Sequence, residues 1–409
     1  MRILNITNTI PYPTTSGGAL RNYNLLRRIA ARHEVWLATH LYAPQEIEGV
    51  PHLQGFCQEV CTALMMRRPK IEHLPGLLRY ALAGRPPELK FLHSTELERH
   101  IHRLCAQVQF DIIQIEESRM ALYLESVPAS QRGRRVLAFY DIAFAQTARF
   151  WPLERTIGGR ARMWFYSQMM RRWEPRYAGR YDRCTTVSES DRQLLLAANP
   201  RLRVDVVPNG VDTHLYQPLP ANNGAPALLF IGNMSYLPCV DAAVYLVRDI
   251  LPHIRRAGRD VELWIVGADP APQVLQLAGD GVHVTGRVPD IEPYYARARV
   301  SVVPLRAGGG TRLKILESMA LGRPVVATSI GCEGLDVAGG EHLYIADDAE
   351  QFANYVVRLL SDAGDYARVV GNARRLVVER YDWDAIAARL LSIYEELAQA
   401  GHNSPRTAG

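Results

Sequence analysis

One stretch of the sequence, residues 300–328, combines glycines and cations in an order that suits a phosphate ligand. Three consecutive glycines precede a predicted helix, which lets a ligand approach the backbone closely and meet the free N–H groups of the helix start. Three cationic side chains flank these glycines, and an arginine fork matches phosphate oxygens. The stretch therefore predicts a diphosphate seat. Its residues are Arg306, Gly308, Gly309, Gly310, Arg312 and Lys314.

Glu317 follows on the same predicted helix. Gly310, Lys314 and Glu317 have the i, i+4, i+7 spacing of one helix face. At about 1.5 Å per residue, Glu317 lies about 9 Å along the axis from Thr311, roughly the separation of a ribose from the diphosphate of one nucleotide. Because a carboxylate accepts two hydroxyl hydrogen bonds at once, Glu317 is predicted to clamp a ribose. The alternative is a solvated Glu–Lys pair behind an ordinary glycine turn, which leaves the glycines and cations unexplained.

The elements that position these side chains alternate between short apolar runs and longer helical patterns, which is typical of a parallel sheet wrapped by helices. The alternation restarts after residues 218–224, where turn formers replace any apolar periodicity. The predicted strands are Arg2–Ile6, Val35–Thr39, Asp111–Ile115, Val136–Phe139 and Thr185–Val187 before this break, and Ala227–Gly232, Val261–Gly267, His283–Thr285, Val300–Pro304 and Pro324–Thr328 after it.

Two Rossmann-like, doubly wound α/β domains follow from this pattern. The predicted N-terminal domain spans residues 1–218 and is completed by a C-terminal helix in 383–409, and the predicted donor domain spans 219–382. A long amphipathic helix is expected at Val240–Ile254. Ligands of such domains bind at the carboxyl ends of the strands, so we expect the two sets of loops to face each other across a cleft.

Composition narrows the class of protein. The chain has 409 residues, 48% hydrophobic and 22% charged, and lacks a continuous apolar run of membrane-spanning length or a signal peptide, so the expected location is the cytoplasm. Its six scattered cysteines predict free thiols. A formal net charge of +5 suits phosphate-bearing ligands or an anionic membrane surface. Without a recognisable nucleic-acid module, no nucleic-acid partner is predicted.

No metal or other cofactor is predicted. Asp382 and Asp384 form a D-x-D pattern that metals use in some transferases. The first of these carboxylates is placed to cap the helix that begins at Trp383, and carboxylates in the first turn are favoured by the helix dipole. Capping is therefore the preferred interpretation.

Four motifs together resemble those of the retaining glycosyltransferases of family four, a large GT-B group with many mannosyl-, glucosyl- and N-acetylglucosaminyltransferases. The resemblance covers nearly the full length of the chain. The motifs are Leu316–Ala327, similar to L-E-A-M-A-x-G-x-P-V-V-A; Val207–Asp212, similar to the interdomain P-N-G-V-D; Val187–Asp191, at the end of the first domain; and Pro11–Gly18, similar to a P-P-x-x-G-G loop.

This resemblance implies transfer of a sugar from a nucleotide diphosphate donor, with retention and without a metal. The acceptor would be a glycan, a lipid-linked molecule or a small molecule, as in polysaccharide biosynthesis. Positioned cations and a helix N-terminus would stabilise the departing diphosphate. The catalytic residues implied are Asp141, Arg312 and Lys314. The donor-binding residues implied are Gly17, Gly18, Asn209, Gly232, Asn233, Arg287, Val288, Arg306, Gly308, Gly309, Gly310, Thr311, Leu313 and Glu317.

The chain departs from the family pattern at two places. Members often have a glutamate eight residues before the one matched by Glu317, and here that position is Gly309. Backbone groups of Gly308–Thr311 are expected to replace its contact with the donor sugar. The loop that follows Gly232 lacks the usual Arg and Lys. Arg312 and Lys314 are therefore expected to carry more of the charge.

Roles in the first domain stay open between two interpretations. Gly17 and Gly18 either let donor phosphates approach the first helix or form a tight turn without a ligand. Asp141 follows a predicted strand, where family members commonly have a His or Asp near the reacting sugar, but an Asp there is also a routine cap. Glu116 and Glu117 either contact an acceptor or are solvated loop charges.

Residues 160–173 mix arginines with aromatic and methionine side chains at helical spacing. Such a helix can lie on an anionic bilayer and bring the enzyme to a lipid-linked acceptor at the inner face of the plasma membrane. The alternative is that Trp164, Phe165, Met169 and Trp173 pack onto the sheet and the arginines form a solvated face.

Two other functions remain compatible with the pattern. A GT-B nucleotide-sugar epimerase shares the fold and the diphosphate seat, and needs acid/base groups but no acceptor. A non-catalytic nucleotide-binding scaffold would explain Gly309 in place of a glutamate. A hydride-transfer enzyme is disfavoured, since no Gly-x-Gly-x-x-Gly occurs at a strand-to-helix turn.

Overall fold

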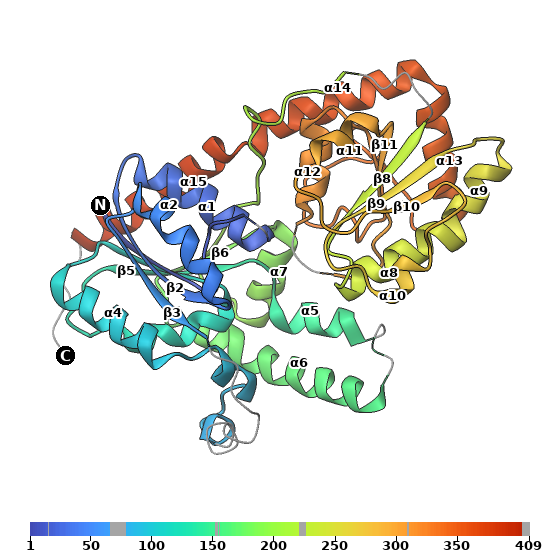
Figure 1. Ribbon diagram of the computed structural model, residues 1–409. Helices are drawn as coiled ribbons and strands as arrows, with labels where there is room; N and C mark the ends of the chain where they lie inside the picture. Colours follow the sequence, from blue (N-terminus) through green and yellow to red (C-terminus); the bar gives the residue numbers. More distant parts are fainter. Residues whose placement is uncertain are drawn as a thin grey trace. The chain divides into compact units, whose positions relative to one another are not determined.

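The computed structural model describes residues 1–14, 16–65, 79–151, 154, 156–220, 226–308 and 311–402. Its contacts divide the chain into two compact units, each a sheet with helices around it (Figure 1). Unit 1 comprises Met1–Ala148, Thr156–Pro208 and the chain from Asp384 on, and unit 2 comprises Arg149–Arg155 and Asn209–Trp383.

Apart from the short segment Arg149–Arg155, the chain passes from unit 1 to unit 2 after Pro208, ten residues before the predicted boundary. The reason is that the residues directly after Pro208 bond to unit 2. The Val211 N–H donates to the Tyr381 carbonyl at 2.8 Å. The backbone N–H and hydroxyl of Thr213 donate to the Asp382 carboxylate at 3.1 and 2.6 Å. Long-range hydrogen bonds therefore place the residues directly after Pro208 in unit 2.

Unit 1 contains a parallel sheet in the order β3-β2-β1-β4-β5-β6-β7 among its described residues. Strands β3 and β7 were not predicted, because β3 is only partly buried and β7 is very short. The strands are β1 Arg2–Thr7, β2 Glu34–Leu41, β3 Glu59–Leu64, β4 Ile112–Glu116, β5 Arg134–Phe139, β6 Arg183–Thr186 and β7 Val204–Val206.

The helices of unit 1 begin at side-chain caps in several places. Ser16 caps the first helix by accepting from the Ala19 N–H at 3.2 Å. The α-helices are α1 Gly17–Ala30, α2 Val50–Gln54, α4 Thr95–Gln107, α5 Ala143–Phe150, α6 Ile157–Ala178, α7 Glu189–Ala198 and α15 Trp383–His402. Shorter 3-10 helices are η1 Pro44–Gly49, η3 Pro87–Leu92 and η4 Ser118–Ser126.

Unit 2 has a second parallel sheet, in the order β10-β9-β8-β11-β12-β13 within the described part of the chain. The strands are β8 Ala227–Ile231, β9 Glu262–Val266, β10 Val282–Val284, β11 Val300–Val303, β12 Val325–Ala327 and β13 Tyr344–Ile345. The helices are α8 Leu237–Tyr245, η6 Leu246–Ile250, α9 Leu251–Arg256, α10 Pro272–Leu275, α11 Glu292–Arg297, α12 Leu313–Ala320, α13 Ala349–Ser361 and α14 Ala363–Arg380.

The predicted doubly wound α/β fold is confirmed in both units. The helix expected at Val240–Ile254 runs through α8, a π-helical turn at η6, and α9. In each sheet the strand order reverses beside the first strand of the unit, at β1/β4 and at β8/β11. Such a switch point leaves room for a ligand between loops that diverge to opposite sides. The loops after β1, β4, β8 and β11 are therefore where sites are expected.

Helix α15 completes unit 1 through a buried hydrogen bond. Tyr394 is fully buried, and its hydroxyl donates to the Oε1 atom of Gln114 on β4. Removing this hydroxyl leaves a buried amide oxygen without its partner, which costs about 1 to 3 kcal/mol of unfolding free energy.

We expect Tyr394→Phe to lower the midpoint of thermal or urea unfolding accordingly. The control is Tyr355→Phe, since Tyr355 stacks on Tyr344 and its hydroxyl makes no hydrogen bond within the described residues. Equal stability changes in the two variants would contradict the role given to Tyr394.

Candidate functional site

The glycine loop of unit 2 lies between β11 and α12, as the sequence predicts. Gly309 and Gly310 lie outside the described residues. Gly308 has φ of +133°, a conformation that side chains rarely adopt, and a Cβ there would lie 2.4 Å from an Nη2 atom of Arg312. The close approach of this guanidinium to the backbone thus requires glycine at position 308.

Lys314 extends from α12 toward the end of β8. Its Nζ atom lies 4.9 Å from the centroid of the Phe230 ring and 4.0 Å from the Cys239 sulfur. A Cβ on Gly232 would lie 3.0 Å from the same Nζ atom, so Gly232 leaves space for the ammonium group. Burial lowers the pKa of Lys314. A desolvated ammonium group favours an anion beside it, as a diphosphate site requires.

Glu317 lies one turn further along α12 and is also removed from water. Burial raises the pKa of its carboxyl, and Lys314 opposes that shift. The Tyr295 hydroxyl lies 3.5 Å from its Oε2 atom and donates to the Lys314 carbonyl at 3.3 Å. Both side chains are partly buried, which disfavours the alternative of a solvated Glu–Lys surface pair.

Arg312 and Thr311 are buried at the start of α12. Burial lowers the pKa of Arg312. The Asn209 amide donates to the Thr311 hydroxyl at 2.7 Å, which brings this residue of the P-N-G-V-D motif to the glycine loop. The Thr311 hydroxyl hydrogen is left to donate elsewhere. Leu313 opens the helix and is partly buried.

Two of the predicted donor-binding arginines contact carboxylates outside the glycine loop. Arg306 makes a bidentate ion pair with Asp241 of α8, at 2.9 and 2.6 Å, and its guanidinium lies 4.4 Å from the Tyr245 ring centroid. In this structure the guanidinium is thus held by a carboxylate 65 positions away, and its contact with a diphosphate stays a prediction. Arg287 is largely exposed and lies 3.6 Å from Asp269.

The remaining donor residues form loop ends in unit 2. Asn233 accepts from the backbone N–H and hydroxyl of Ser235 at 2.9 and 2.7 Å, which closes a turn after β8. Val288 packs partly buried against a small cluster that includes Tyr295 and Val266. No base-reading contact can be assigned to Val288 from these interactions.

Arg149 is a residue of unit 2 that the sequence did not reveal. It makes two hydrogen bonds with Glu333, one of them 2.8 Å long, and donates to the Gly308 carbonyl at 3.2 Å. It therefore restrains the glycine loop from a distant part of the chain. Nothing in its local sequence distinguishes it from the other arginines.

Unit 1 has a polar cavity of about 260 Å³ at the carboxyl ends of β1, β4 and β5 and the start of α1. Its lining includes Gly18 and Asp141, two of the predicted residues, and Gly17 is the preceding residue of α1. A Cβ on Gly18 would lie 3.2 Å from the Tyr140 ring, so glycine keeps this wall open. The full lining is Asn8, Thr9, Ser16, Gly18, Glu117, Ser118, Arg119, Tyr140 and Asp141.

Asp141 has an unusual environment in this cavity. Burial raises the pKa of its carboxyl to about 6, against the opposing charge of Arg119. The Gln146 amide donates to its Oδ2 atom. The first N–H groups of α5 donate to Glu174 and not to Asp141. The interpretation of Asp141 as a helix cap is therefore not supported, whereas its position in the cavity wall suits contact with a ligand.

Glu116 and Glu117 differ sharply although they are neighbours. Glu116 is fully buried and accepts from Asn5 and Gln114 inside the sheet, so both predicted roles, acceptor contact and solvated charge, are wrong for it. Glu117 lines the cavity with φ of +69°, and its carboxylate accepts from Arg119 at 2.9 Å. A strained non-glycine residue in a cavity wall points to a functional constraint.

Helix α6 also differs from the packing interpretation. Trp173 is buried, but Trp164 and Phe165 are 52% and 56% exposed and Ile157 is 88% exposed. The expectation that Trp164 and Phe165 pack onto the sheet is wrong. The second half of α6 supplies the buried face and the first half presents its aromatic side chains to solvent.

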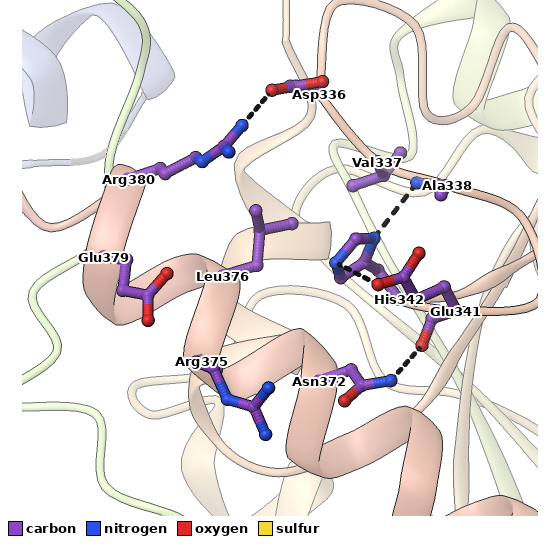
Figure 2. A pocket seen from close by; sticks show the side chains of 10 residues that line it. All are labelled: Asp336, Val337, Ala338, Glu341, His342, Asn372, Arg375, Leu376, Glu379 and Arg380. Atoms are coloured by element: carbon purple, nitrogen blue, oxygen red, sulfur yellow. Dashed lines mark hydrogen bonds and ion pairs between the residues drawn. The ribbon is translucent and has the colours of Figure 1, made fainter.

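Another cavity, of about 410 Å³, lies between residues 336–342 and α14 in unit 2. Figure 2 shows that several of its polar and charged groups contact one another. Arg380 donates to Asp336, and His342 lies between the Ala338 N–H and the Glu341 carboxylate. With mixed charges, this cavity is a poorer candidate for a diphosphate.

Family comparison covers most of the chain. Residues 15–215 match the family described as Glycosyltransferase Family 4, and residues 225–362 match Glycosyl transferases group 1. The chain belongs to the group 1 glycosyltransferases. This confirms the family that the sequence motifs resemble.

Curated relatives of this group 1 glycosyltransferase include two mycobacterial proteins. A phosphatidyl-myo-inositol mannosyltransferase from Mycobacterium leprae is 30% identical over 247 residues, which is 58% of this chain and 64% of the relative. An MMP alpha-(1->4)-mannosyltransferase from Mycolicibacterium hassiacum is 28% identical over 264 residues, 59% of this chain and 62% of the relative. The chain thus spans less than two thirds of the length of these relatives.

Solved structures match over nearly the whole chain. Sucrose-phosphate synthase from Thermosynechococcus elongatus has a TM-score of 0.73 at 19% identity, with 98% of this chain and all of that chain covered. Anabaena HepE in complex with UDP-glucose has a TM-score of 0.67 at 17% identity, with 97% and 100% covered. At such identities the likeness shows the fold, and it confirms the predicted pair of GT-B α/β units.

The geometry of unit 2 generates a binding prediction. We expect Lys314→Ala and Glu317→Ala each to weaken binding of a sugar nucleotide about ten- to a hundredfold, since a hydrogen bond to a charged group contributes about 1.5 to 3 kcal/mol. Binding would be measured by thermal shift, where a donor at about 100 times its Kd adds about 2.7 kcal/mol of stability.

The matched control is Arg375→Ala, which removes a cation from the cavity of Figure 2 and leaves the glycine loop intact. Circular dichroism checks that all three variants fold. Wild-type donor affinity in the Lys314 and Glu317 variants would show that α12 is not the diphosphate seat.

Proposed function

We propose that this chain transfers a sugar from a nucleotide diphosphate donor to an acceptor hydroxyl, with retention and without a metal ion. The observation that carries the proposal is the buried start of α12, where Arg312 and Lys314 follow a glycine loop and Glu317 follows them one turn on. Desolvated cations beside free helix N–H groups suit a diphosphate, and the carboxylate suits ribose hydroxyls.

The chemistry follows from the charge that develops on the donor. As the glycosidic bond to the diphosphate breaks, negative charge grows on the phosphate oxygens. Lys314, Arg312 and the Thr311 hydroxyl stabilise that charge from positions that require no rearrangement. Arg149 holds the Gly308 carbonyl and so keeps the loop in its conformation. These groups make the diphosphate a better leaving group.

The acceptor is proposed to enter the polar cavity of unit 1. Glu117 and Arg119 offer hydrogen-bonding groups for the acceptor hydroxyls. Asp141 supplies a carboxyl whose pKa, raised by burial to about 6, lies near neutral pH. Gly17 and Gly18 are proposed to admit donor phosphates to the start of α1. The group 1 family and the names of the mannosyltransferase relatives support a hexosyl donor.

The decisive experiment is turnover. UDP-, GDP- and ADP-sugars are screened by thermal shift, and the best donor is then incubated with candidate acceptors in excess EDTA. Transfer in EDTA, with the donor's anomeric configuration retained in the product by NMR, is the expected result. Sugar-nucleotide conversion without acceptor would identify an epimerase. Tight binding with no turnover under any acceptor or metal condition would identify a scaffold.

Asp141 should impose a pH dependence on transfer. A carboxyl with a pKa of about 6 is mostly protonated at pH 5 and mostly ionised at pH 7, so activity that needs the carboxylate rises through this window. We expect Asp141→Asn to lower kcat by about a hundredfold or more, in line with loss of a positioned acid/base group, and to remove the acidic limb.

Donor affinity of Asp141→Asn should stay close to wild type, because its side chain is not among the proposed contacts to the diphosphate and the ribose. The comparison variant is Asp205→Asn, whose carboxylate accepts from Arg183 at 2.9 Å and does not line the cavity. An unchanged acidic limb in Asp141→Asn would remove Asp141 from the reaction.

A peripheral membrane contact is proposed through the first half of α6. At 100° per residue, positions 157, 164, 171 and 172 share a face, which carries Ile157 and Trp164 with Arg171 and Arg172. The buried residues Met170, Trp173 and Tyr177 occupy the opposite face. Exposed aromatic side chains flanked by arginines suit an anionic bilayer surface.

Among the described residues, no helix has the length and hydropathy that crossing a bilayer needs.

We expect the protein to float with vesicles that contain anionic lipid at low salt, and Arg171→Glu with Arg172→Glu to stay at the bottom of the gradient. Each basic residue near such a surface contributes about 1 kcal/mol. The charge-matched control is Arg201→Glu with Arg203→Glu, at exposed positions outside α6. If the wild type does not float, the acceptor is to be sought among soluble molecules.

A further inference from the structure

Glu174 is a buried carboxyl that belongs to no sequence motif and does not line the cavity of unit 1. It lies in the second half of α6 with 1% of its surface exposed. Its Oε1 atom accepts from the Ser118 hydroxyl and from the Ala143 N–H, the latter at 3.2 Å. Its Oε2 atom lies 3.4 Å from the Phe144 nitrogen, which donates to it. One side chain therefore contacts two separate segments of the chain.

The position of this carboxyl matches the needs of helix α5. The first N–H groups of a helix have no partner within the helix and carry partial positive charge. Glu174 supplies acceptors for two of them from a neighbouring helix. Ser167, about two turns earlier on α6, adds a second link by donating to the Phe144 carbonyl at 2.8 Å. Helix α6 therefore fixes where α5 starts.

Both segments that Glu174 contacts lead directly to the cavity. Ser118 lines it and stands between Glu117 and Arg119, which line it as well. Ala143 follows Asp141 by two residues, and Asp141 forms another part of the lining. Glu174 thus links the Glu117–Arg119 segment to the segment that follows Asp141.

We infer that Glu174 is a positioning residue for the reacting carboxyl Asp141, acting through Ser118 and the start of α5. This inference rests on the proposed function, because it assigns Asp141 to the reaction. Burial raises the pKa of Glu174 to about 7 and so shows the energetic cost of ionising a carboxyl at this place. The three donors that it accepts from offset part of that cost.

Two variants separate positioning from packing. Glu174→Gln keeps an oxygen that can accept from Ser118 and Ala143, whereas Glu174→Ala removes all three hydrogen bonds. We expect Glu174→Ala to lower kcat at least about tenfold with donor KM within about twofold, since a displacement near 1 Å can cost up to about a hundredfold in rate. Glu174→Gln should restore kcat to within about threefold of wild type, because misplacement is what the rate responds to.

The control is Gln131→Ala. Gln131 is 3% exposed, accepts from Phe110, and donates to the Cys105 and Val108 carbonyls, all outside the cavity. Gln131→Ala should lower the unfolding temperature, because it removes buried hydrogen bonds. Its kcat should stay within about twofold of wild type, because these bonds lie outside the cavity. If Gln131→Ala reduces kcat as much as Glu174→Ala, or if Glu174→Ala keeps wild-type kcat, the positioning role is overturned.

A readout independent of transfer tests the same inference. Hydrogen exchange of residues 141–150 and 118–120 should accelerate in Glu174→Ala and remain near wild type in Gln131→Ala, because only the former releases the helix start. If exchange accelerates in Glu174→Ala but the wild-type protein transfers no sugar, the structural link stands and the proposed function is refuted. Unchanged exchange in an active Glu174→Ala variant would refute the link alone.

Discussion

Charged side chains held out of water at the carboxyl ends of two parallel sheets are the constraint on which the rest of this structure depends. In unit 2, burial lowers the pKa of Lys314 and raises that of Glu317. In unit 1, burial raises the pKa values of Asp141 and Glu174 to about 6 and about 7. Desolvation penalises every one of these charges, so each is tolerable only where polar groups or a ligand compensate it. These groups lie at, or pack behind, the loops that follow the strands, which makes those loops candidate sites.

The parallel sheets determine which residues meet. Strand β1 pairs with both β2 and β4, and β4 pairs with β5, so the loops after β1, β4 and β5 emerge at one edge. Asn8, Glu117 and Asp141 become neighbours although more than a hundred residues separate the first two. The same arrangement in unit 2 brings the loop after β8 to the glycine loop after β11. Membership of the group 1 glycosyltransferases is consistent with ligands at both edges.

The departures from the family pattern have a physical counterpart in unit 2. Where relatives often have a glutamate, this chain has Gly309, and nearby Gly308 has a positive φ and the Arg312 guanidinium close to its backbone. Arg306 forms a bidentate ion pair with Asp241, which neutralises the charge of its guanidinium group. Arg149, paired with Glu333, holds the loop from elsewhere in the chain. Positive charge near the glycines thus depends on Arg312 and Lys314, as the sequence predicted for a different reason.

The sequence by itself determined the features that local periodicity encodes. Alternating strand and helix patterns specified two doubly wound units, and the spacing of Lys314 and Glu317 placed both on one face of α12. Tertiary structure alone decided the partners of long side chains and the exposure of each helix face. Arg306 reaches Asp241, Glu116 turns into the sheet, and Glu174 reaches Ser118, all through contacts that a local pattern does not record. Helix α6 shows the same limit, because its spacing fits either a buried or an exposed aromatic face. The choice depends on where neighbouring elements end, and that is a property of the folded chain.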